Sequence, residues 1–325
     1  MAWPGDAKRA PDTRAPTVVH IGANKTASTT FQRALFARSP RIAYLGEDCA
    51  GYPEYRECLD SLVSDDDLHY RAGDVKAVFA RALAARADRT LVYSNEDIMR
   101  SRVPTLCARR IRELLPDAEI LMVTRNQLTA VPSWYVNHGA YLKGVPRRYW
   151  RRYVSFDEWM SYCIAFPNYS PLDGFFYHRF AELYASLFGR ERVHVLLYED
   201  FVTDRDRFIK EFCAILGVDA GEATQLLADS HERRRYTMRA HRYHRFRSWC
   251  LPGRRLTRWV PGGGALSRMW WRHLDAGPPA DGFVSEAWGA RIADLYRADN
   301  SKLADEYGLP MREHGYPLVR EVTSR

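Results

Sequence analysis

The stretch Val18-Val19-His20-Ile21-Gly22-Ala23-Asn24-Lys25-Thr26-Ala27-Ser28-Thr29-Thr30-Phe31-Gln32 decides the fold of this chain. Apolar residues around His20 predict a short buried strand, and helical spacing of apolar residues begins after Ser28. Gly22 permits a tight turn between the two, and the first N–H groups of a helix have no partner within it. Together with the Lys25 ammonium and the hydroxyl groups, these donors predict a site for a phosphate or sulfate. The residues expected to form it are Gly22, Ala23, Asn24, Lys25, Thr26, Ala27, Ser28, Thr29 and Thr30.

The loop departs from the nucleotide-binding pattern G-x-x-x-x-G-K-[ST]. That pattern needs glycine six residues and one residue before the lysine, and Val19 and Asn24 occupy these positions. The remaining pattern, Gly-x-x-Lys-Thr-x-Ser-Thr-Thr after an apolar strand, resembles the 5′-phosphosulfate loop of sulfotransferases that use 3′-phosphoadenosine 5′-phosphosulfate (PAPS). The alternative is a strand-to-helix turn in which Ser and Thr only cap the helix. The family usually has glycine at position 27, so the methyl group of Ala27 is expected to tighten the loop and to alter cofactor affinity.

The composition is that of a globular protein. Of the 325 residues, 46% are hydrophobic and 27% are charged, and the formal net charge of +8 favours anionic partners. The six cysteines are scattered without the spacing of a metal site, so neither a metal nor an oxidising compartment is expected. The N-terminus lacks an apolar segment as long as a signal peptide or a membrane span, and we therefore expect a cytoplasmic protein.

Strand and helix patterns alternate along the chain, which predicts an α/β fold with a mostly parallel central sheet and helices on both faces, as in P-loop NTPases. Further strands are predicted at 41–45, 90–95, 118–124 and 193–198. Helices are predicted from an N-cap at Asp74 to Leu83, from Pro104 to Pro116, over 174–188, from Asp204 to Gly217 and over 286–307. Residues 57–71 are expected to be irregular.

The expected organisation is a flexible tail over residues 1–15, followed by a single domain over 16–325. Within it, a basic and aromatic-rich stretch at about 231–282 contains Pro-Gly and Gly-rich breaks. This stretch is expected to be a loop-rich insertion or lid.

A second part of the site is predicted at Arg125, which directly follows the strongest strand pattern, and at Ser133, eight residues later. Ligands bind at the carboxyl ends of strands in open α/β sheets, so Arg125 is expected beside the loop. In the sulfotransferase resemblance this Arg-x7-Ser pair holds the 3′-phosphate of PAPS, which an arginine fork can bind with two hydrogen bonds. The Arg-Lys-Gly motif of cytosolic members is absent, and Arg235 lies in a comparable place. The alternatives are an ordinary ion pair for Arg125 and a turn cap for Ser133.

The resemblance covers about residues 17–217, and residues 300–308 also look like bacterial members. It implies in-line sulfuryl transfer in which Lys25 stabilises the charge on the bridging oxygen without a metal ion. The acceptor needs a base. Glu96, just past the strand at 90–95, is the first candidate, with a structural ion pair as the alternative, and His138 is the second.

The sequence thus predicts a PAPS-dependent sulfotransferase acting on a hydroxyl or amine of a small-molecule, carbohydrate or lipid acceptor. A P-loop kinase or NTPase is the alternative, for which only Glu96 and Asp97 could serve as magnesium ligands. A nucleic-acid-binding protein is a weaker alternative, because basic and aromatic residues interleave over 233–272 but no recognised nucleic-acid motif is present.

Overall fold

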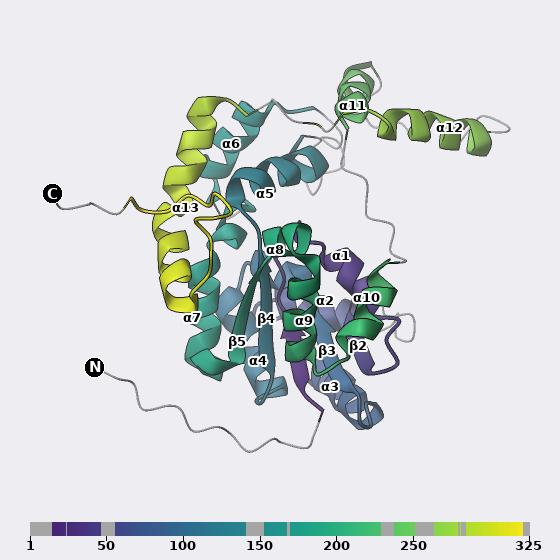
Figure 1. The fold of residues 1–325 in the computed structure, drawn as a ribbon, viewed down its shortest axis with the longest axis vertical. Coiled ribbons are helices and arrows are strands. Elements are labelled where there is room, and N and C mark those ends of the chain that lie inside the picture. The colour runs from purple at the N-terminus through teal and green to yellow at the C-terminus, as the bar shows by residue number, and fades with distance from the viewer. Residues whose placement is uncertain are drawn as a thin grey trace.

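The computed structural model describes residues 15–23, 25–46, 56–140, 153–167, 170–228, 237–250, 263–278, 280 and 284–320. Within these residues, five parallel strands form one sheet in the order β2-β3-β1-β4-β5 (Figure 1). The strands are β1 (Thr17–His20), β2 (Ile42–Gly46), β3 (Thr90–Ser94), β4 (Glu119–Thr124) and β5 (Val193–Leu197). The predicted α/β fold with a parallel sheet is confirmed.

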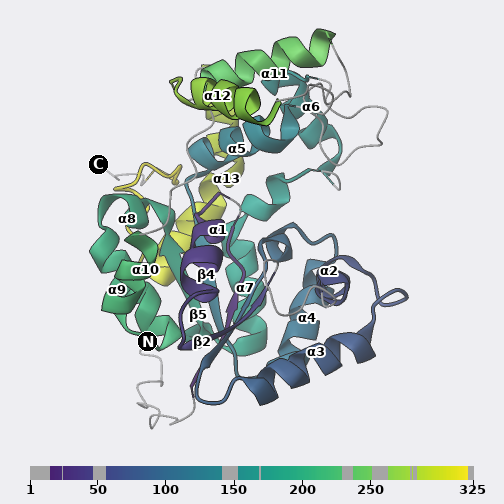
Figure 2. The same ribbon diagram turned by 90° about the vertical axis from the view of Figure 1, so that its right-hand side faces the viewer.

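Helices cover both faces of the sheet (Figures 1 and 2). Val18 and Val19 are neighbours on β1 and enter opposite cores, as the two-residue period of a strand requires. The short helix α1 (Ser28–Thr30) leads into the core around Val18, which includes the π-helical η1 (Phe31–Phe36), α8 (Tyr198–Thr203), α9 (Arg205–Leu216) and α10 (Ala220–Ala228). The core around Val19 includes α2 (Arg56–Ser64), α3 (Ala72–Ala85), α4 (Pro104–Leu114), α5 (Gln127–Trp134), α6 (Phe156–Ala165), α7 (Tyr177–Phe188) and α13 (Glu286–Tyr307).

Short helical turns and two outer helices complete the described elements. They are η3 (Glu96–Arg100), η4 (Tyr135–Gly139), η7 (Leu172–Phe175), η8 (Arg190–Arg192), α11 (Met238–Cys250) and α12 (Gly263–Asp275). Figures 1 and 2 both place α11 and α12 at the end of the molecule beyond α5, away from the sheet. In the part of the chain that is described, no helix combines the length and the apolar character needed to cross a membrane.

Aromatic packing fixes the helix that follows the first strand. The Phe31 ring stacks on Phe212 with centroids 4.6 Å apart and meets the edge of Phe201 at 5.1 Å. Phe31 and Phe212 are essentially buried, and an aromatic pair contributes roughly 0.5–1.5 kcal/mol beyond the area it buries. The helix after the loop is thereby fastened to α8 and α9.

Several local predictions were wrong. Asp74 is not the N-cap of α3, because the helix begins at Ala72 and the Asp74 carboxylate instead pairs with Arg71 at 2.7 Å. Of the range 57–71 that was predicted to be irregular, residues 57–64 belong to α2, and 65–71 form loop and turn. Part of the stretch predicted to be loop-rich forms α11 and α12. Arginine, alanine and methionine in α11 favour a helix. The sequence analysis gave more weight to the Pro-Gly breaks that follow α11 and therefore predicted a loop. The predicted tail, except for Ala15, and Arg235 lie outside the described residues.

Candidate functional site

The loop from Gly22 to Thr30 leaves the central strand at the carboxyl edge of the sheet. Beyond β1 the chain still pairs with β4, because Ile21 N–H donates to the Leu121 carbonyl at 2.9 Å and Ala23 N–H to the Val123 carbonyl at 3.1 Å. The strand order reverses at β1, with β3 on one side and β4 on the other. Ligands of open α/β sheets bind at such a reversal, outside the carboxyl ends of the strands.

Two residues of the loop have left-handed backbone conformations. Lys25 has φ 73°, and Ala27 has φ 61° and ψ 16°. The Ala27 carbonyl accepts hydrogen bonds from the N–H groups of Thr30 at 2.8 Å and Phe31 at 3.1 Å, so the helix begins at Ser28. Glycine would suit this position better than Ala27, since a left-handed residue with a Cβ costs about 1–2 kcal/mol.

The loop hydroxyls divide into two groups. Thr26 and Ser28 are buried, and Thr26 Oγ1 donates to the Ala23 carbonyl at 2.6 Å and lies 3.2 Å from Ser28 Oγ. Thr29 and Thr30 are half-buried, and their hydroxyls form no hydrogen bond to the residues that the structure describes. Thr26 and Ser28 therefore shape the loop from inside, whereas the Thr29 and Thr30 hydroxyls are not used within the described structure. Asn24 lies outside the described residues.

A buried histidine lies beneath the loop. His20 Nδ1 is 2.8 Å from Ser94 Oγ, which also accepts a hydrogen bond from Gln32 Nε2 at 3.0 Å. The Ser94 hydroxyl can accept from Gln32 and donate to Nδ1, which leaves the ring proton on Nε2. Nε2 is buried and has no hydrogen-bond partner among the described residues. Burial lowers the pKa of His20 to about 4, so the ring is neutral at pH 7. A Cβ at Gly22 would lie only 2.5 Å from Nε2, so this position accepts no side chain without displacement of the histidine.

Arg125 extends from the end of β4 to the loop. Its Nη1 donates to the Lys25 carbonyl at 2.9 Å and its Nε to Thr129 Oγ1 at 3.0 Å, while its guanidinium lies 4.9 Å from the centre of the Tyr198 ring. Burial raises the pKa of Tyr177, so its hydroxyl stays protonated and donates to the Arg125 carbonyl at 2.8 Å. Arg125 is half-buried, and hydrogen bonds fix both its backbone and its side chain.

Ser133 follows Arg125 on the same side of α5. Residues four apart in a helix are neighbours on one face, so Ser133 lies one turn beyond Thr129, toward which the Arg125 side chain points. Among the described residues Arg125 does not bond to Ser133 itself. One anion placed along this face of α5 would meet both side chains.

The Trp134 ring gathers charged side chains from different parts of the sequence. Lys25 Nζ lies 5.8 Å from the ring centre and the Arg100 guanidinium 4.5 Å from it, while His138 stacks on the ring with centroids 4.2 Å apart. The sequence prediction included Lys25 and His138 but missed Trp134 and Arg100. A tryptophan directly after Ser133 was the available signal, because cations are attracted to the faces of aromatic rings.

Glu96 lies at the carboxyl end of β3, opposite Arg125 across the central strand. It is half-buried and begins η3, which Asn95 caps by accepting a hydrogen bond from Asp97 N–H at 2.9 Å. Asp97 is exposed and pairs with Arg100 at 2.7 Å. In the described part of the chain no three His, Cys, Asp or Glu side chains are grouped as a metal site would need. The structure therefore brings the loop, Glu96 and Arg125 to one edge, as predicted.

Comparison with known proteins gives structural similarity only. No model of a protein family matches the chain, and no curated protein matches its sequence. A sulfotransferase from Alicyclobacillus acidocaldarius is similar in structure, with 21% identity, 63% of this chain and 82% of that chain covered, and a TM-score of 0.46. The sulfotransferase domain of the Synechococcus PCC 7002 olefin synthase follows with 16% identity, coverage of 69% and 81%, and a TM-score of 0.40. Mouse sulfotransferase SULT7A1, in complex with PAP, has 11% identity, coverage of 87% and 90%, and a TM-score of 0.37. TM-scores below 0.5 do not decide function, which has to be argued from the residues of this chain.

Proposed function

We propose that the chain is a sulfotransferase that takes its sulfuryl group from PAPS and passes it to a hydroxyl or amine. The observation that carries the proposal is the arrangement of cations and hydroxyls around one strand end. The loop offers Lys25, Thr29 and Thr30, and Arg125 binds the Lys25 carbonyl while its side chain follows α5 toward Ser133. The loop can bind one anionic group, and Arg125 with Ser133 can bind a second anionic group of the same ligand.

The donor groups suit PAPS chemically. When bound, PAPS supplies the sulfuryl group and leaves as PAP. The loop hydroxyls and the first N–H groups of α1 would hold the 5′-phosphate, and Arg125 with Ser133 would hold the 3′-phosphate. Lys25 would stabilise negative charge that increases on the departing phosphate, a role for which a preorganised donor is worth most in the transition state.

The acceptor proton requires a base. Glu96 is the proposed base, since it is half-buried at the same edge of the sheet as the loop. His138 is the second candidate, because its ring stacks on the tryptophan that Lys25 also approaches. Either side chain would remove the proton from the acceptor as its oxygen or nitrogen attacks sulfur.

Thermal denaturation with added nucleotides tests the proposal. PAP without magnesium should stabilise the protein more than ADP does, since only PAP carries the 3′-phosphate that Arg125 would bind. At a hundred times its dissociation constant a ligand adds about 2.7 kcal/mol to the free energy of unfolding. Equal stabilisation by ADP and PAP would contradict the proposed 3′-phosphate site. Stabilisation by Mg-ATP alone would favour a kinase or NTPase.

A further inference from the structure

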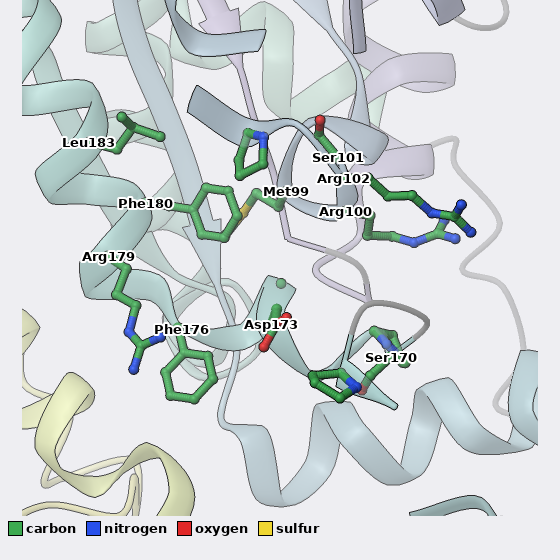
Figure 3. Close-up of a pocket in the computed structure, with 14 residues that line it drawn as sticks. Met99, Arg100, Ser101, Arg102, Ser170, Asp173, Phe176, Arg179, Phe180 and Leu183 are labelled. Atoms are coloured by element: carbon green, nitrogen blue, oxygen red, sulfur yellow. The ribbon is translucent and has the colours of Figure 1, made fainter. Parts of the chain in front are cut away.

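A pocket of about 670 Å³ is lined by residues of η3, η7 and α7 (Figure 3). Arg100 is one of the residues that line it, and the same guanidinium lies over the Trp134 ring that Lys25 approaches. Met99 also lines the pocket and belongs to η3, which begins at Glu96. A 3₁₀-helix rises about 2 Å per residue, so the pocket begins about 6 Å along the backbone from Glu96. One turn of this helix therefore connects Glu96 with the lining of the pocket.

The centre of the pocket is apolar. Met99, Phe176 and Phe180 line it, and each is at least nine-tenths buried. Figure 3 shows Met99 and Phe180 between arginines on two sides, with Arg100 and Arg102 on one side and Arg179 on the other. This order of charged, apolar and charged surface fits an elongated ligand with an apolar body.

Arg179 supplies the positive charge at the end away from Trp134. Its guanidinium lies 4.0 Å from the centre of the Phe176 ring, which holds the planar group against the apolar wall. Among the described residues it makes no ion pair within 4.0 Å. The pocket also contains Asp173, whose pKa is raised because burial outweighs the opposing effect of the Arg179 charge. The lining thus holds three arginines and one carboxylate, and of the arginines Arg100 already pairs with Asp97 at 2.7 Å. The charge of Arg179 also acts on the nearby Asp299 carboxylate.

We propose that this pocket binds the acceptor, and that the acceptor is an amphiphile with an anionic group at the end opposite to its reactive hydroxyl. The apolar body lies along Met99, Phe176 and Phe180, the anion pairs with Arg179, and the hydroxyl faces the end of the pocket formed by Arg100. The inference rests on the proposed function, because it assigns the substrate class of the same site. Arg179 is then a specificity-determining residue and takes no part in the chemistry.

Isothermal titration calorimetry with chosen probes tests the acceptor class. The probes are 10-hydroxydecanoic acid and its methyl ester, titrated into the full-length protein with and without PAP. We expect the acid to bind about tenfold more tightly than the ester, as one charge-assisted hydrogen bond of about 1.4 kcal/mol would give. A parallel titration with 10-hydroxydecyl phosphate identifies the preferred anion, and preference for either anion over the ester supports the proposal.

Two arginine variants assign the effect to the pocket. Arg179→Gln should bring the acid to the affinity of the ester, and Arg179→Lys should keep part of the preference. Arg291→Gln is the matched control, since Arg291 also lies over an aromatic ring, 5.1 Å from the centre of Trp288, but does not line the pocket. Equal affinity of acid and ester for the unmodified protein, or a preference that survives Arg179→Gln, would overturn the proposal.

PAP titrated alone keeps the two proposals separate. Binding of PAP without a preference for the anionic probes overturns the acceptor class and leaves the proposed sulfotransferase in place. A preference for the anionic probes without binding of PAP overturns the proposed donor and keeps the pocket as an anion-selective site. Loss of both would refute both proposals.

Discussion

Replacing Ala27 by glycine tests the left-handed turn of the loop. Removal of the Cβ relieves about 1–2 kcal/mol of backbone strain, and the greater freedom of glycine in the unfolded chain offsets about 0.4–1 kcal/mol of this. The Ala27 methyl group is half-buried against the core around Phe31, and its loss costs about 0.4 kcal/mol, half the value for a fully buried carbon. Ala27→Gly should therefore stabilise the fold by about 0.4 kcal/mol.

Two other alanines provide matched controls for this small effect. Ala87 also has a left-handed φ, of 50°, but is exposed, so Ala87→Gly should stabilise by about 0.8 kcal/mol. Ala298 is exposed within α13, where glycine should destabilise by about 0.5–1 kcal/mol. We expect the urea midpoint of unfolding to be highest for Ala87→Gly, lower for Ala27→Gly and lowest for Ala298→Gly. The dependence of the free energy of unfolding on urea concentration should be the same in all three variants.

The result that would refute this reasoning is a loss at Ala27→Gly as large as the loss at Ala298→Gly. It would mean that Ala27 is not left-handed in the folded protein. Binding of PAP to the three variants adds a second readout, because only Ala27 belongs to the loop. A change in PAP affinity at Ala87→Gly would show that the effect is not local to the proposed site.

The remaining predictions concern catalysis, donor recognition and acid stability. Lys25→Ala should lower turnover at saturating substrates by about 10²–10³ while PAP binding changes less, and unchanged turnover would make Lys25 a binding residue only. Glu96→Gln should lower turnover by about 10²–10⁴ with PAP binding kept, whereas a large loss confined to His138→Gln would transfer the role of base. Arg125→Met should reduce stabilisation by PAP to that by ADP in a melting experiment. The pKa of His20 falls from 6.5 in the unfolded chain to about 4 in the folded one, so the unfolded state takes up the proton first as the pH is lowered. About 3 kcal/mol of the free energy of unfolding should therefore be lost between pH 6.5 and pH 4, and His20→Gln should not show this loss.

The sheet could be predicted because its signals are local. Each strand is a short apolar run, and glycines at 217 and 308 end α9 and α13 with φ of 63° and 62°. The helix α6 could also have been predicted, since Ser155 and Glu158 form a capping box that is visible in the sequence. The N-cap at Asp74 failed because an acidic residue in the first turn is favourable at more than one position, and this one pairs with Arg71.

The sequence predicts which strand ends form the site. It does not predict the directions in which the side chains at these ends point. The loop, Glu96 and Arg125 meet because parallel strands bring their carboxyl ends to one edge. Whether a hydroxyl faces inward or outward depends on the backbone turn, and the left-handed conformations that bury Thr26 are unusual for residues other than glycine. The approach of Arg100 to Trp134 depends on how η3 packs beside α5, which no local pattern in the sequence encodes.

The buried floor of the loop, formed by His20, is neutral, and its solvent-facing mouth carries the positive charges. The floor is His20, bonded through Ser94 to Gln32, and its ring stays uncharged at pH 7 because the site is buried. A charged ring there would place a positive charge under Gly22, where no solvent offsets the cost of burial. The positive charge at the mouth instead comes from Lys25 and Arg125, which are half-buried and have solvent on one side. An anion bound at the mouth therefore meets charges that were never fully desolvated, on a neutral floor whose shape does not change with pH above the range in which His20 titrates.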